Sequence, residues 1–61
     1  MNYQPIDKDT PRDGTKIVIA RFEQPSGSFS WAGLGVWDTR KFVRLHAEPP
    51  YRQPTHWAPL P

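Results

Sequence analysis

The side chains able to do chemistry in this 61-residue chain are few and scattered. His46 and His56 are its histidines, and it contains no cysteine. A zinc site takes three or four ligands at a recognisable spacing, and two histidines without a thiolate partner do not provide one. The sequence therefore predicts no metal site. We expect His56 to orient its neighbour Trp57 through a hydrogen bond.

The acidic residues near the start resemble the opening of a calcium-binding loop. Asp7, Asp9 and Asp13 supply carboxylates, but Pro11 occupies the third ligand position and Val18 stands where the bidentate Glu belongs. The pattern therefore predicts a solvated turn without an ion.

Nucleophilic catalysis has no better support. Ser26, Ser28 and Ser30 lie outside any Gly-x-Ser-x-Gly elbow. No pair of carboxylates has an evident reason for divergent pKa values. We therefore expect no catalytic residue, no cofactor and no enzyme activity. An unrecognised hydrolase remains as a third functional hypothesis, after the protein-binding and nucleic-acid-binding ones given below.

Composition limits the chain to one small domain, residues 1–61. A chain of this length hides only about 60% of its unfolded surface and needs outside help to be stable. No apolar run approaches the roughly 20 residues of a membrane span, and the first residues lack the features of a signal peptide. We expect a cytoplasmic protein that does not enter membranes. Its formal charge of +2 is too small to indicate nucleic acid by itself.

Turn chemistry and β-branched runs predict an all-β fold. Pro11-Arg12-Asp13-Gly14 forms a turn that leads into the densest β-branched stretch, a strand over 15–22. Two further strands are expected over 31–37 and 42–46, with residues 1–10 as an extended lead-in and 47–61 as a proline-rich tail packed on the sheet. The expected fold is a three- to four-stranded antiparallel meander, coiled into an SH3-like open barrel and closed by the tail. The alternative is an open sheet that dimerises through an edge or through its aromatic face.

The expected register groups the aliphatic side chains on one face. Ile19 is placed opposite Leu34 and Ile17 opposite Val36, and the second hairpin pairs Val36 with Val43. Because side chains alternate along a strand, this register predicts a core face and an opposite, aromatic face. The expected core residues are Ile17, Ile19, Leu34, Val36, Val43 and Leu45. The opposite face would carry Val18, Ala20, Phe22, Trp31, Gly33, Gly35, Trp37, Phe42, Arg44 and His46.

The opposite face is the candidate partner-binding site. Aromatic rings alternating with cations are typical of protein hot spots and also of grooves that grip single-stranded nucleic acid. Alternatively, the tail crosses this face and Trp57 packs on Gly33 and Gly35. The candidate partner-binding residues are Trp31, Trp37, Arg40, Lys41, Phe42, Arg44 and His46.

The two ends of the chain resemble a family of small phage and prophage proteins. The resemblance rests on Pro11-Arg12-Asp13-Gly14-Thr15-Lys16-Ile17 and on the closing segment Pro54-Thr55-His56-Trp57-Ala58-Pro59-Leu60-Pro61. Members of that family commonly end on Thr-His-Trp-Met-Pro-Leu-Pro, and Ala58 here replaces the usual Met. The family has no established activity, so the resemblance implies a phage-related origin and transfers no site residue.

These observations predict a non-enzymatic accessory protein that binds a host or phage protein. The alternative is a small nucleic-acid-binding barrel. A monomer or a weak homodimer is expected.

Overall fold

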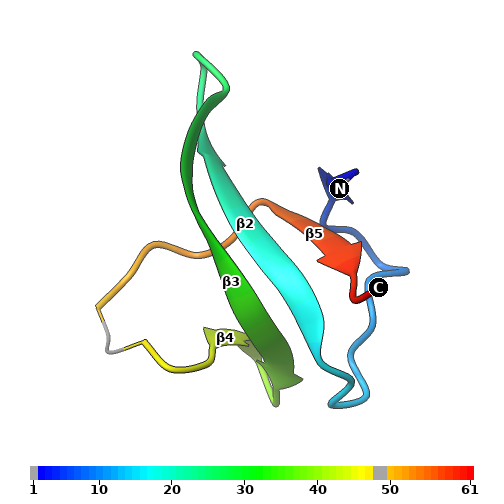
Figure 1. Cartoon of the computed structure of the whole chain (residues 1–61). Helices are drawn as coiled ribbons and strands as arrows, with labels where there is room; N and C mark the ends of the chain where they lie inside the picture. The colour runs from blue at the N-terminus through cyan, green and yellow to red at the C-terminus, as the bar shows by residue number, and fades with distance from the viewer. Residues whose placement is uncertain (1, 48–49) are drawn as a thin grey trace.

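The computed structural model describes residues 2–47 and 50–61. These residues form one antiparallel sheet of five strands, in the order β1-β5-β2-β3-β4 (Figure 1). The strands are β1 (Gln4–Pro5), β2 (Ile17–Glu23), β3 (Ser28–Asp38), β4 (Lys41–Arg44) and β5 (His56–Pro59). The all-β class is confirmed. The sheet has five strands rather than three or four, and it is not closed. Within the described ranges, no helix is long and apolar enough to cross a membrane.

Strands β2 and β3 form a long hairpin that projects beyond the rest of the sheet (Figure 1). Gly27 closes its turn at a positive φ of 75°, and its N–H donates to the carbonyl of Glu23 at 2.6 Å. The pairing then shifts by one residue between Arg21 and Phe22, which is a β-bulge. A bulge adds an unpaired residue to one strand, so it reverses which face the following side chains occupy.

This bulge makes the expected register of the first hairpin wrong by one residue. Ile17 lies opposite Gly35, and Ile19 lies opposite Gly33. The isoleucines therefore share a face with the glycines and tryptophans of β3, and Leu34 lies on the other face. The expected register paired apolar residues across a loop with an even number of residues. The bulge adds one residue between the turn and these pairs, which makes that number odd, and Ile17 and Ile19 each pair one position earlier along β3 than expected.

The second hairpin has the expected register. Val36 pairs with Val43, and the N–H of Leu45 donates to the carbonyl of Leu34 at 2.9 Å. Asp38 and Lys41 also pair, so the connection between the strands is only Thr39 and Arg40. This pairing keeps Leu45 on the same face as Leu34.

The end of the chain is a strand inside the sheet. Strand β5 lies between β1 and β2, with Trp57 opposite Ile19 on one side and opposite Gln4 on the other. Thr55 joins it to β2, because its N–H donates to the carbonyl of Ala20 and its hydroxyl accepts from the N–H of Phe22.

The hydrophobic core lies on the aromatic side of the sheet. Its fully buried large residues are Ile17 and Ile19, and Phe42 is only 4% exposed. Four partly buried side chains pack around them: Ile6, Trp31, Trp37 and Trp57. Of the six residues expected to form the core, only the two isoleucines belong to it.

Candidate partner-binding surfaces

The aromatic face is the side of the sheet that carries the hydrophobic core. Arginine side chains of this protein stack on its aromatic rings. The guanidinium carbon of Arg44 is 4.7 Å from the ring centre of Trp31. The same arginine lies over Gly33, where an added Cβ would come within 3.1 Å of its Nε. The stack is a cation–π contact made inside the molecule. The residues of this face are Ile17, Ile19, Arg21, Trp31, Gly33, Gly35, Trp37, Phe42, Arg44 and Trp57.

Arg12 occupies the other end of this face. Its guanidinium lies 4.8 Å from the ring centre of Trp37 and 5.5 Å from that of Phe42. It also donates to the carbonyls of Asp7 and Thr10, at 2.7 and 3.2 Å. Arg12 thereby fixes the N-terminal segment to the sheet.

The segment 51–55 crosses the same face on its way to β5. The ring of Tyr51 meets that of Trp31 edge-on, with centroids 6.0 Å apart. Further along, Arg21 donates to the carbonyl of Gln53 at 2.7 Å. The tail therefore covers part of the aromatic face, as one alternative expected, but Trp57 is not the residue that approaches the glycines. An added Cβ at Gly35 would meet Ile19, and one at Gly33 would meet Arg44.

The seven candidate residues do not form one surface. Phe42 is buried in the core, and Trp31 and Trp37 are half-buried beneath arginines. Arg44 is half-buried against Trp31 and is thus engaged within the molecule. The exposed members of the set lie at the β3–β4 turn and just after β4: Arg40, Lys41 and His46.

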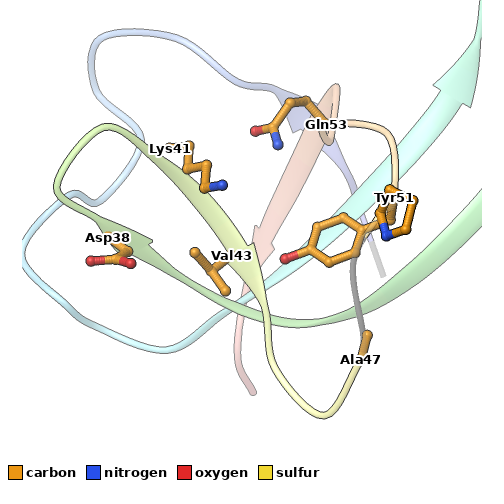
Figure 2. Close-up of a pocket in the computed structure, with 7 residues that line it drawn as sticks. Asp38, Lys41, Val43, Ala47, Tyr51 and Gln53 are labelled. Atoms are coloured by element: carbon orange, nitrogen blue, oxygen red, sulfur yellow. The ribbon is translucent and has the colours of Figure 1, made fainter.

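A pocket of about 460 Å³ lies beside β4, with Lys41 in its wall. One side comes from β3 and β4, and the other from Ala47 and from residues 50–53. Figure 2 shows the phenol of Tyr51 directed toward β4. The residues that line the pocket are Asp38, Lys41, Val43, Ala47, Pro50, Tyr51 and Gln53.

Two contacts hold Tyr51 in this wall. Its hydroxyl accepts a hydrogen bond from the backbone N–H of Arg44 at 2.8 Å, and its ring rests against Trp31. Sequence reasoning missed Tyr51, since it treated residues 47–61 as packing material for the sheet. The available signal was an aromatic residue directly after Pro49-Pro50.

The second surface is the opposite side of the sheet, here called the aliphatic face. Val18 lies between Leu34 and Ala58, and Leu45 extends this row to the strand β4 side. Leu34 belongs to a central strand, yet 37% of its surface is exposed. The register places both apolar and polar residues on this face, of which Ala20 and Ala58 are fully buried: Val18, Ala20, Ala32, Leu34, Val36, Asp38, Lys41, Val43, Leu45, His56 and Ala58. Val43 also borders the pocket, so the two surfaces meet at β4.

The perturbed carboxylates lie outside the pocket lining. A hydrogen bond from Arg21 lowers the pKa of Glu23, and the positive charge of Arg52 lowers it further. A hydrogen bond from Thr15 lowers the pKa of Asp13. Both acids are therefore ionised at neutral pH, and neither is poised as a proton donor. Among the described residues, no three His, Asp or Glu side chains gather where they could hold a metal ion.

Comparison of the chain with protein-family models, with curated protein sequences and with solved structures gives no match.

Proposed function

We propose that this chain is a small non-enzymatic accessory protein of phage or prophage origin, acting in the host cytoplasm by binding a host or phage protein. The binding site is the pocket beside β4. One observation carries this proposal: a pre-formed pocket with a fixed tyrosine and an exposed lysine in its wall. Its volume lies in the range of about 300–1,000 Å³ found for binding pockets. The phage origin rests on the closing segment of the sequence alone.

The lining favours a protein side chain as the occupant. Val43 and the ring of Tyr51 offer apolar contact, and Lys41 adds a charge at the rim. Tyrosine anchors are typical of interface hot spots, and a tyrosine that is already held in place lowers the entropic cost of binding. Arg40 and Lys41 outnumber Asp38 at this turn, so the expected partner segment pairs an apolar side chain with an acidic one.

The nucleic-acid alternative has weaker support. Stacking of bases requires open ring faces. Phe42 is buried, and Arg44 lies over the ring of Trp31. The proposal retains the SH3-like open barrel as a description of the coiled sheet, in which the pocket lies at the open β4 edge.

A pull-down from bacterial lysate tests the proposal. The immobilised wild-type chain is compared with Lys41→Glu, which reverses the charge at the pocket. The matched control is Lys16→Glu, directly before β2, which lies two strands away from β4 in the sheet. We expect a specific protein that the wild type and Lys16→Glu retain, and that Lys41→Glu loses.

Nuclease treatment separates the two functions. Binding of a protein at this pocket would be overturned if the captured protein were lost after nuclease treatment. It would also be overturned if Lys41→Glu captured as much of that protein as the wild type. Circular dichroism of both variants establishes that the charge reversals leave the fold intact.

A further inference from the structure

We propose that the partner enters the pocket as an extended strand that pairs antiparallel with the outer edge of β4, so that the sheet gains a strand from another protein. The inference rests on the proposed function and deepens it, because it specifies the backbone conformation of the partner and the spacing of its side chains. The added strand would carry an apolar residue and, two positions later, an acidic one.

The first argument is that β4 is an end strand with an outward-facing edge. It is the last strand in the order of the sheet and has β3 on its other side. In an antiparallel pair, alternate residues of a strand direct both their N–H and C=O groups toward the same neighbour. The N–H of Leu45 donates to the carbonyl of Leu34 in β3 at 2.9 Å. By this alternation Val43 also faces β3, and Arg44 and Phe42 face outward.

Tyr51 supports this alternation and marks where the free edge ends. Its hydroxyl accepts the N–H of Arg44 at 2.8 Å, on the side of β4 away from β3. The outward-facing backbone groups of Phe42 lie two residues earlier in β4. The side chain of Phe42 is buried in the core, so the position of this backbone is fixed. A fixed sheet edge of this kind is the element to which extended peptides add as a further strand.

The pocket lies along this edge and supplies the room for the added strand. Lys41 and Val43 form its wall on the β4 side, and Tyr51 and Gln53 lie across from them (Figure 2). Because Tyr51 reaches β4 with the end of its side chain, the backbone of its segment stands away from β4 by the length of that side chain. A strand in the pocket would lie about 4.8 Å from β4, between the two walls.

The register of the added strand decides which of its side chains enter the pocket. A residue opposite Phe42 would exchange both backbone hydrogen bonds with it. Its two neighbours would lie opposite Val43 and Lys41, on the side of the sheet where these residues line the pocket. In an antiparallel strand the neighbour of Val43 comes first, and an apolar side chain suits it. The neighbour of Lys41 comes two positions later, and an acidic side chain there forms a favourable cross-strand pair.

Charge favours a strand from another protein over a second copy of β4. Lys41 is exposed, and its partner in β3 is Asp38. An added acid would lie one strand away from Lys41 and two strands away from Asp38, so its attraction to the lysine is the stronger interaction. A second copy that paired through Phe42 would place Arg40 of each copy opposite Arg44 of the other. Like charges directly opposite one another destabilise a sheet.

A short peptide with the expected spacing tests the inference directly. The probe is acetyl-Thr-Val-Thr-Glu-Thr-amide, titrated into the isotope-labelled full chain and followed by NMR. We expect saturable shifts of the backbone amides of Lys41, Phe42 and Val43. The amide proton of Phe42 should move downfield as it becomes a hydrogen-bond donor to the peptide.

N-methylated forms of the probe separate backbone pairing from side-chain contact. A methyl group on the nitrogen of the central Thr removes the donor to the carbonyl of Phe42, and it should weaken binding by at least about 10-fold. The matched control carries the methyl group on the nitrogen of the Glu, whose N–H faces away from β4. This control should bind as the parent peptide does.

Two results would overturn strand pairing. One is equal affinity of the two N-methylated peptides, and the other is the absence of shifts in β4 with up to about 5 mM of the parent peptide, a concentration that excludes even millimolar affinity. The pull-down with Lys41→Glu tests the proposed function without reference to the backbone of the partner. A captured protein that Lys41→Glu loses, together with equal affinity of the N-methylated peptides, would therefore retain the binding pocket and reject the added strand.

Discussion

The side chain of Ile19 fills the space above Gly35. An added Cβ at position 35 would lie 2.5 Å from Cδ1 of Ile19 and 3.0 Å from the carbonyl oxygen of Val43. Ile19 reaches this position diagonally, because its direct partner across the strands is Gly33. The large side chain of Ile19 in β2 thus fills the space left by the absence of a side chain at Gly35 in β3.

Gly35→Ala should therefore destabilise the fold. The new methyl group clashes with a buried side chain and with backbone, and overpacking of this kind costs about 1–3 kcal/mol. A domain of this size loses about 4–8 °C in melting temperature per kcal/mol, which thermal melting by circular dichroism can measure. The matched control is Gly33→Ala, where the nearest atom is Nε of Arg44 at 3.1 Å, at the end of a flexible side chain. A loss at Gly33→Ala as large as that at Gly35→Ala would contradict the packing described.

Truncations at Ile19 and Leu34 distinguish the two faces. Ile19 is completely buried, and Ile19→Ala should cost about 2–5 kcal/mol. Leu34 is 37% exposed, and Leu34→Ala should cost well below that range. Urea denaturation at low protein concentration measures both. Equal costs would restore the register in which Ile19 faces Leu34.

Arg12 should contribute to stability through the rings beneath it. Its stack on Trp37 and Phe42 lies at the surface, where a cation–π contact contributes about 0.5–1 kcal/mol. We expect Arg12→Ala to lose this and to expose Trp37 further, shifting tryptophan fluorescence to longer wavelength. Arg12→Lys keeps the charge but not the planar fork that donates to the carbonyls of Asp7 and Thr10. Its melting temperature should therefore lie between those of the wild type and Arg12→Ala. The experiment fails to support the contact if Arg12→Ala leaves both emission and melting temperature unchanged.

Acid should weaken the contact between Glu23 and Arg21. Because the hydrogen bond to Arg21 lowers the pKa of Glu23 below its ordinary value of 4.5, the folded state favours the ionised acid. This contribution is present above pH 4.5 and is lost as the pH falls through the lowered pKa of the folded state. Glu23→Gln should therefore lower the melting temperature at neutral pH, and the difference from wild type should vanish in strong acid. A difference that persists unchanged in acid would assign the effect of the substitution to something other than the charge.

The sequence predicts well what depends on local chemistry. The existence of β2, β3 and β4, the turn that includes Asp13 and Gly14, and the pairing of Val36 with Val43 follow from β-branched runs and short polar turns. The first hairpin was predicted in the wrong register for a specific reason. Its bulge beside Arg21 adds a residue, and nothing in the apolar pattern marks where that residue goes.

The candidate site depends on contacts between distant residues, which the pattern does not encode. Trp31 and Arg44 were recognised as binding groups by residue type, but their mutual contact satisfies both within the molecule. Tyr51 enters the pocket wall only because Arg44 donates to it across the loop. Strand β5 was also missed, since a short strand that ends at Pro59 has the composition of a tail.

The place of β5 in the sheet has a consequence for the order in which the fold assembles. The two hairpins close over short spans, from Glu23 to Ser28 and from Asp38 to Lys41. Gln4, in contrast, meets Trp57, which lies 57 − 4 = 53 residues later. Loop closure over a longer span costs more entropy, and long-range pairing slows folding. We therefore expect the hairpins to form first and β5 to dock on β2 afterwards. Among the described strands β1 pairs with β5, so we expect β1 to join last.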